Sequence, residues 1–376
     1  MLLEIVGIVV TDEILFGCTV FLTRISISNS CRRLLDHLQN GDLAARMTNL
    51  DCLILDEADQ LLDMGFRPDI ERILKCLQPS RATRQTLLFS ATIPNSVEEI
   101  AGIAMRPHYN FVDTVGQDEE QTHLHVQQQL MVSSQELLIR DLFSILERET
   151  AHGQAYKIIV FFTTARLTGF MAEMFNSVAA DTGYQVLEIH SRKSQSQRGR
   201  ASDAFRRQRN AIMFSSDVTA RGMDYPDVTF VLQVGLTDRS QYIHRLGRTA
   251  RAGKDGKGGL LIADYEEFHM TRKELADMPL ERIPVPDTRA ATHAASRAIG
   301  NVATTDTLRN SAEQAYRAWL GYYNGHLRKI RWDKKQLVEQ ANLWGSEVGL
   351  KSQPGMQKRT IGKMGLKGVP GLKIEN

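Results

Sequence analysis

The chain has 376 residues, of which 42% are hydrophobic and 24% charged, and 46 Lys and Arg against 44 Asp and Glu give a net charge of +2. This composition excludes collagen-like, coiled-coil and largely disordered chains, and the length suits about two to three domains. The charge is uneven: residues 281–376 hold 16 basic and 8 acidic side chains, a net of +8, which leaves −6 for residues 1–280. A basic end on an acidic body suggests a polyanionic partner.

The first residues of the chain indicate neither a membrane anchor nor a targeting signal. Acidic side chains interrupt the apolar runs of residues 5–10 and 14–22, so no stretch is long enough to cross a bilayer. The four cysteines match no zinc or redox spacing, which favours a reducing compartment.

From Leu53 to Ala263, short apolar runs alternate with stretches of helical period, which is typical of a parallel sheet covered by helices. The predicted strands are Cys52–Leu55, Thr86–Phe89, Ile158–Phe162, Gln185–Ile189, Ala211–Phe214, Thr229–Val234 and Leu260–Ala263. The predicted helices include Gln60–Leu77, Ala165–Ala179 and Gln197–Gln208. A polar stretch at 113–121 breaks the period, so we expect two α/β units joined by a linker.

After Pro279 the strand pattern ends and helical patterns rich in alanine follow. Tyr316, Trp319, Tyr322 and Tyr323 form one stripe on a predicted helix, and such a stripe is more often packed core than a binding surface. Beyond residue 350 the composition of Gly, Lys and Pro predicts a flexible basic tail.

Polar residues follow directly after several predicted strands, where parallel sheets bind ligands. The tetrad Asp56-Glu57-Ala58-Asp59 could hold a hydrated Mg²⁺ and orient an attacking water, or could simply be an acidic turn that caps the next helix. The triplet Ser90-Ala91-Thr92 follows the next strand.

In the second unit, arginines recur every third residue at Arg245, Arg248 and Arg251. Three guanidinium groups on one helical turn would repel each other unless an anion such as a triphosphate neutralised them. The alternative is a surface helix with scattered charge.

These segments resemble motifs of the DEAD-box RNA helicases. Residues 56–59, 90–92, 217–224 and 244–251 are similar to motifs II, III, V and VI, in the family's order, and Gln195 with Arg198 resembles its QxxR element. The resemblance runs from about Arg33 to Asp264. It implies an α/β fold of two RecA-like parallel-sheet domains, the first truncated, plus a mostly α-helical C-terminal extension. The C-terminal part resembles the fungal mitochondrial members that act as splicing RNA chaperones, which implies a mitochondrial location.

The resemblance also implies domain boundaries. They are 1–29 for an atypical N-terminus without family resemblance, 30–112 for the partial first domain, 113–121 for the linker, 122–285 for the second domain, 286–350 for the helical extension and 351–376 for the tail.

By resemblance, each motif residue has a role in binding ATP, Mg²⁺ or RNA. The catalytic residues would be Asp56, which contacts Mg²⁺ through water, Glu57, which positions the attacking water, the arginine fingers Arg248 and Arg251, and His244. Ser90 and Thr92 would couple the nucleotide state to RNA, and Gly222 and Asp224 would approach the nucleotide. The RNA backbone would meet Arg33, Gln195, Arg198 and Ser216.

The family's P-loop, GxxxxGK[ST], does not occur in this sequence, nor does its Q motif. Where the family has Thr-Pro-Gly-Arg, residues 30–33 read Ser-Cys-Arg-Arg, so the RNA contact of Arg33 is in doubt. We expect a gene model with a mistaken N-terminal end, and a genuinely shortened protein is the alternative.

The sequence therefore predicts an ATP-dependent RNA helicase or RNA chaperone whose chain is itself deficient in hydrolysis. The alternative is a non-catalytic RNA-binding fragment, and a related DNA helicase is disfavoured by the full tetrad. The basic C-terminal residues would tether RNA through its phosphates, or would form a solvated surface.

Overall fold

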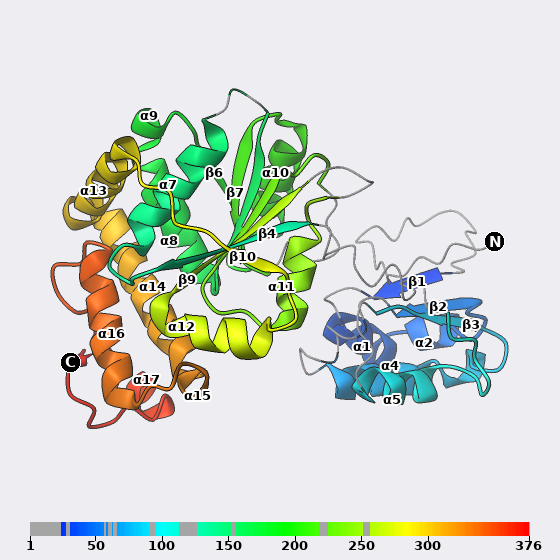
Figure 1. The fold of residues 1–376 in the computed structure, drawn as a ribbon. Helices are drawn as coiled ribbons and strands as arrows, with labels where there is room; N and C mark the ends of the chain where they lie inside the picture. Colours follow the sequence, from blue (N-terminus) through cyan, green and yellow to red (C-terminus); the bar gives the residue numbers. More distant parts are fainter. Residues whose placement is uncertain are drawn as a thin grey trace. The chain divides into compact units, whose positions relative to one another are not determined.

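The computed structural model describes residues 24–27, 31–55, 58, 62, 66–90, 95–112, 126–151, 153, 155–217, 225–250 and 256–375. The chain divides into two compact units, Met1–Thr114 and Val115–Asn376 (Figure 1). This division falls inside the stretch 113–121 that the sequence marks as a linker, although the stretch itself lies outside the described residues.

The first unit contains a three-stranded parallel sheet in the order β1-β2-β3, with helices packed against it. Its strands are β1 (Arg24–Ile27), β2 (Cys52–Leu55) and β3 (Gln85–Leu88). Its helices are α1 (Cys31–Asn40), α2 (Leu43–Arg46), α4 (Arg67–Cys76) and α5 (Asn95–Ala104). Leu53 and Leu55 of β2 are buried among apolar side chains of α1 and α4, so the strand that leads into Asp56 lies at the centre of this core.

The second unit contains a seven-stranded, entirely parallel sheet in the order β10-β4-β9-β8-β5-β7-β6. Its strands are β4 (Gln127–Ser133), β5 (Lys157–Phe161), β6 (Val186–Ile189), β7 (Ala211–Ser215), β8 (Phe230–Val234), β9 (Lys257–Ala263) and β10 (Leu280–Arg282). Its helices up to β10 are α7 (Leu138–Thr150), α8 (Ala165–Asn176), α9 (Ala179–Thr182), α10 (Gln195–Arg207), α11 (Arg239–Leu246) and α12 (Asp264–His269), which continues as a π-helix, Met270–Glu274.

Both faces of this sheet are covered. Alternate residues of β5, Ile158 and Val160, pack with α7 and α8, whereas Ile159 and Phe161 pack on the opposite face with Phe205 of α10. Because side chains alternate along a strand, a strand buried on both faces is apolar throughout, and this is why the central strands are visible in the sequence.

The structure confirms all seven predicted strands with small shifts of their ends. It adds three strands to the two larger sheets, β1, β4 and β10, of which β10 follows Pro279, where the sequence pattern indicated no further strand, and two short strands near residues 355 and 373. The predicted helix Gln60–Leu77 is observed as α4 from Arg67, and residues 59–61 and 63–65 lie outside the described part.

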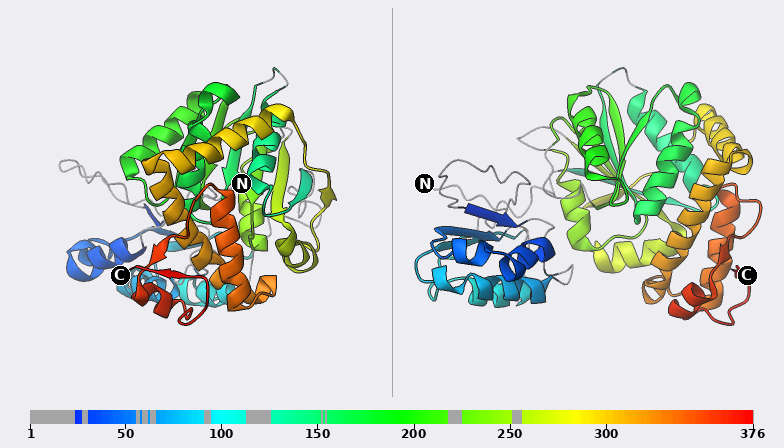
Figure 2. Two further views of the ribbon diagram at one scale, coloured as in Figure 1. Left: turned by 90° about the vertical axis from the view of Figure 1, so that its left-hand side faces the viewer. Right: turned by 180° about the vertical axis from the view of Figure 1, so that it is seen from behind.

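The C-terminal extension is helical, as predicted. It consists of α13 (Arg289–Thr304), α14 (Asp306–Asn324), α15 (Leu327–Ile330) and α16 (Lys334–Glu347). Helix α13 packs on α7 and α14 packs on α8, so the long helices of the extension lie along one side of the second unit (Figure 2). Tyr316, Trp319 and Tyr323 are buried at this junction, which confirms that the aromatic stripe is packed core.

The prediction of a flexible tail is wrong. Residues 355–374 form the two-residue strands β11 (Gly355–Met356) and β12 (Lys373–Ile374) around helix α17 (Lys358–Lys363), and the chain folds back onto α14 and α16. The tail buries Met356, Ile361 and Leu366. Its glycines do not loosen it, because three of them, at 365, 368 and 371, have positive φ and build turns that other residues adopt poorly.

A buried carboxylate joins the extension to the sheet. Glu266 of α12 is fully buried, and its Oε1 accepts hydrogen bonds from the Tyr323 hydroxyl of α14 at 2.6 Å and from the Leu236 amide at 3.0 Å. Its Oε2 accepts from the Ala263 amide at 2.8 Å. Burial raises the pKa of Glu266 to about 7, although these hydrogen bonds act in the opposite direction.

We expect the stability of the second unit to fall as the pH rises toward neutrality. The carboxyl has its ordinary pKa of 4.5 when unfolded and about 7 when folded, so the folded state holds the proton more tightly. Its contribution is complete below the unfolded pKa and is lost as the pH passes the folded pKa. From about pH 5.5 to about pH 8 the free energy of unfolding should drop by about 2 kcal/mol.

Urea unfolding followed by tryptophan fluorescence measures this drop, because all three tryptophans, at 319, 332 and 344, belong to the extension. Glu266→Gln should remove this component of the pH dependence. Tyr323→Phe should move it to higher pH, since the tyrosine hydroxyl lowers the pKa of the carboxyl. A stability that is flat over this range in the unaltered chain would contradict the expectation.

Candidate functional site

Half of the predicted site residues lie where the structure gives no description. Outside the described residues are Asp56, Glu57, Thr92, Gly222, Asp224 and Arg251. Arg33 lies on α1, and its side chain is not described. The roles of all these residues, including a Mg²⁺ contact through Asp56, therefore remain predictions.

The two motif ends of the first unit are neighbours in space. Strands β2 and β3 pair in parallel with Leu55 beside Leu88, and beyond them the Phe89 amide donates to the Leu55 carbonyl at 2.9 Å. The Ala58 amide donates to the Phe89 carbonyl at 3.0 Å. Ala58 of the acidic tetrad and half-buried Ser90 thus lie beyond the same edge of the sheet, as parallel pairing requires.

In the second unit, the predicted RNA contacts stand at the carboxyl ends of β6 and β7. These strands pair with Ile189 beside Ser215, and the Ser216 amide donates to the Ile189 carbonyl at 3.2 Å. Helix α10 begins shortly after β6, where Ser194 caps it and Gln197 bonds back to the Ser194 amide. Exposed Gln195 and half-buried Arg198 lie in its first two turns.

A buried histidine holds the loop between β6 and α10, and the sequence interpretation missed it. His190 is 5% exposed, its Nδ1 accepts from the Arg192 amide at 3.3 Å, and its Nε2 lies 3.2 Å from Oε2 of Glu188. Because Nδ1 accepts a hydrogen bond from this amide, Nε2 carries the proton and donates to the carboxylate. Desolvation raises the pKa of Glu188, but hydrogen bonds from His190 and Lys193 outweigh it and hold the pKa below its ordinary value. A charged residue inside the apolar strand was the available signal.

The interpretation of three arginines that await an anion is wrong for Arg245. This side chain is 1% exposed, and its Nε and Nη2 donate to Asp217 Oδ1 at 2.9 and 2.5 Å. Its guanidinium carbon lies 5.4 Å from the ring centroid of Phe161. A protein carboxylate already neutralises Arg245, and the ion pair connects the segments that begin at 217 and 244.

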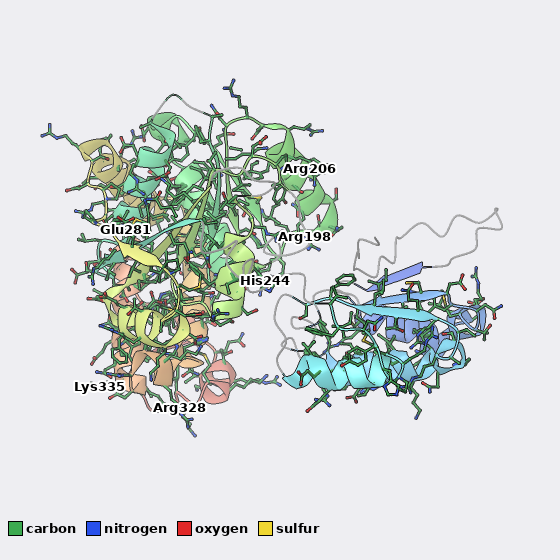
Figure 3. All side chains as sticks on the ribbon, turned by 45° about the vertical axis from the view of Figure 1, so that its right-hand side comes forward. Arg198, Arg206, His244, Glu281, Arg328 and Lys335 are labelled. Carbon is green, nitrogen blue, oxygen red and sulfur yellow. The ribbon has the colours of Figure 1, made fainter. Side chains whose placement is uncertain are left out.

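Arg248 lies beyond the end of α11 and is half-buried. Its Nε donates to the carbonyl of His244 at 3.2 Å, and its amide donates to the Arg245 carbonyl at 3.1 Å. Figure 3 shows His244 on α11 and Arg198 on α10, two helices that both begin after strand ends. The structure therefore brings Ser216 and Arg198 to the carboxyl edge of one sheet. Arg248 lies beside Thr249, whose hydroxyl donates to the Val228 carbonyl just ahead of β8, so Arg248 lies near the amino end of that strand.

Two family models match the chain: "DEAD/DEAH box helicase" over residues 23–100 and "Helicase conserved C-terminal domain" over residues 138–253. The first match begins at residue 23, so the prediction that residues 1–29 carry no family resemblance is wrong for residues 23–29.

Similar proteins and structures agree with these matches. DEAD-box ATP-dependent RNA helicase 26 of Oryza sativa subsp. japonica is 44% identical over 355 residues, which cover 92% of this chain and 64% of that protein. Helicase 31 of Arabidopsis thaliana is 45% identical, over 91% of this chain and 46% of that protein. The structure of Mss116p bound to single-stranded RNA and AMP-PNP has a TM-score of 0.78 and 26% identity, covering 92% of this chain and 70% of that chain.

Two parallel-sheet units with polar motif residues at their strand ends define a RecA-like helicase architecture. The chain belongs to the DEAD-box family of ATP-dependent RNA helicases. It spans less than two thirds of the length of the two curated relatives above. In the described residues, no helix could span a membrane, and no three His, Cys, Asp or Glu side chains are grouped to hold a metal ion.

Proposed function

We propose that this chain carries the RNA-binding and nucleotide-coupling surface of a DEAD-box RNA helicase or RNA chaperone. The supporting observation is that Ser216 and Arg198 lie at the carboxyl edge of the seven-stranded sheet, where Asp217 is joined by an ion pair to Arg245 of the segment 244–251. Contacts to the sugar-phosphate backbone would give affinity for single-stranded or structured RNA without sequence preference.

ATP with Mg²⁺ would be the nucleotide cofactor. Asp56 would contact Mg²⁺ through water and Glu57 would position the attacking water. Arg248 and Arg251 would stabilise developing charge on the phosphates. The bond from Arg248 Nε to His244 O fixes one end of the guanidinium and supports such a role. A mitochondrial location and a part in RNA splicing stay predictions from the C-terminal sequence.

One observation favours a second candidate, RNA binding without hydrolysis. The sequence contains no GxxxxGK[ST], whose backbone amides and lysine bind the β- and γ-phosphates in the family.

We also propose that the basic side chains of residues 351–376 hold RNA through its phosphates. The six basic side chains of residues 351–376 are all exposed, so they can be replaced by glutamine without removing the buried residues of the tail.

The two candidates are separated by an ATPase assay with and without single-stranded RNA, combined with fluorescence anisotropy of a labelled oligoribonucleotide. We expect RNA to bind and hydrolysis to stay at background. RNA-stimulated turnover would refute the non-catalytic candidate, and absence of RNA binding would refute both.

Arg248→Ala is the control for any turnover that is observed. Removal of an arginine finger lowers the rate by roughly 10³ to 10⁵, so activity of this chain should vanish in the variant. Turnover that persists at the same rate comes from a contaminating ATPase.

A further inference from the structure

A second basic surface lies on the helical side of the second unit. Helix α15 of the extension packs on α12, and there the guanidinium carbon of Arg331 lies 3.8 Å from the ring centroid of Phe268. Phe268 is 47% exposed, an unusual exposure for a phenylalanine, and Arg331 is exposed as well. We call this stacked pair the Phe268–Arg331 platform.

The backbone holds the platform in place. Arg331 caps α15 with φ of 59°, a left-handed conformation that costs a non-glycine residue about 1 kcal/mol. The next residue, Trp332, packs 4.4 Å from Tyr265, and its amide donates to the Leu327 carbonyl at 3.1 Å. This half-buried neighbour fixes the turn and so directs the Arg331 side chain onto the phenyl ring.

The surroundings of the platform are positively charged. Arg272 and Lys273 lie on the π-helix that continues α12, and Arg328 lies on α15. All three are exposed, and neither they nor Arg331 has a carboxylate partner among the described residues. Three carboxylates on or near these elements are already paired, Glu267 with Arg282, Glu274 with Lys329 and Asp277 with Arg239. Asp264, at the start of α12, accepts a hydrogen bond from the Tyr265 amide. Arg328 lies well apart from Arg198 and His244 in Figure 3, so this is a separate surface.

We propose that the platform binds single-stranded RNA, with one base stacked on the outer face of the Arg331 guanidinium and phosphates near Arg272, Lys273 and Arg328. This inference rests on the proposed RNA-binding function and adds a site to it. Guanidinium planes and aromatic rings are common supports for unstacked bases, and surrounding cations bind the backbone without regard to sequence.

A flat ligand suits this geometry better than an acidic peptide does. Stacking on Phe268 covers one plane of the guanidinium and leaves the other plane open to a base, and a carboxylate would bind the N–H groups at the edge without needing that plane. The feature that distinguishes the two partners is therefore the planar face, and the test must remove the plane while it keeps the charge.

The experiment measures binding of the full 376-residue chain to a fluorescein-labelled single-stranded oligoribonucleotide at several salt concentrations. Arg331→Lys keeps the charge but loses the plane, and Phe268→Leu keeps apolar cover but loses the ring. Each should weaken binding by about 5- to 30-fold with little change in the salt slope. Lys335→Gln is the matched control, because Lys335 is 68% exposed on α16 and pairs with Glu339; it should change affinity less than about twofold.

Urea unfolding of each variant verifies that the fold is kept. If both variants bind RNA as tightly as the unaltered chain, the platform is not an RNA site and the inference is overturned, while the proposed function stands. If the unaltered chain binds no RNA, the proposed function itself fails. If polyglutamate displaces the RNA, and Arg331→Lys weakens polyglutamate binding as much as RNA binding, the surface serves acidic peptides and the inference is likewise overturned.

Discussion

Replacing Arg245 by alanine should lower the free energy of unfolding of the second unit by about 3 kcal/mol, the low end of the cost of breaking a buried ion pair, because the guanidinium is buried but its partner Asp217 is 44% exposed. The side chain is 1% exposed, donates twice to Asp217 and stacks on Phe161. Its truncation removes both bonds, leaves a carboxylate without its partner and opens a cavity beside the ring. Urea unfolding followed by tryptophan fluorescence measures the loss.

Arg309→Ala is the matched control. Arg309 on α14 is 41% exposed and pairs with Asp306, which is 81% exposed, so its loss should cost less than about 1 kcal/mol. The sign of the Arg245 result is itself decisive. A guanidinium that has no partner until a phosphate binds would repel its basic neighbours in the free protein, so its removal would stabilise the fold. That outcome would favour the interpretation that Arg245 binds an anion together with Arg248 and Arg251.

The sequence could not assign Arg245 because its partner is remote. Spacing every third residue places Arg245, Arg248 and Arg251 on one helical turn only if the helix continues, and α11 ends at Leu246. Asp217, which neutralises Arg245, comes from the end of β7, 28 positions earlier. Periodicity describes neighbours along one element, whereas this ion pair depends on how two strand ends meet.

Strands that a local sequence pattern reveals were predicted, whereas a strand that depends on a remote partner was not. The strands β5, β7 and β8 lie inside the sheet and each contains at least three consecutive apolar residues, so the sequence shows them directly. Strand β4 begins Gln127-Gln128-Gln129 and reads as a loop, although Gln128 is 2% exposed. Its buried amide is satisfied by the hydroxyl of Tyr242, which donates to Oε1 at 2.9 Å. A polar side chain can be core when a distant partner satisfies it, and no local pattern reveals that partner.

The motif residues themselves could be identified from the sequence because several of them follow directly after predicted strands. Once β6 and β7 are recognised, a parallel sheet must bring Ser216 and the start of the helix that carries Arg198 to one edge. The buried support beneath them was not predictable: the pair of His190 and Glu188 combines a loop residue with a residue inside a strand. The prediction for the C-terminal tail failed for another reason. Its glycines were taken as a sign of flexibility, but in the structure three of them have positive φ and form turns.

Gly349→Ala should destabilise the extension by about 3 kcal/mol. Helix α16 ends in a turn in which the Leu350 amide donates to the Gly345 carbonyl at 2.9 Å and the Gly349 amide donates to Ser346 at 3.0 Å. Gly349 has φ of 96°, and a Cβ there would lie 2.4 Å from the carbonyl oxygen of Ile299. The backbone of α13 cannot withdraw as a flexible side chain would, so strain from φ and overpacking add together.

Gly300→Ala, one position from Ile299, is the matched control. Gly300 lies within α13, and a Cβ there meets no atom within 4 Å. Alanine should therefore stabilise the helix by about 0.5–1 kcal/mol. The fluorescence of Trp319, Trp332 and Trp344 during urea unfolding reports both changes, because these tryptophans lie in the extension. Opposite signs for the two substitutions are expected, and an equal, small effect of both would show that α13 and the end of α16 are not packed as described.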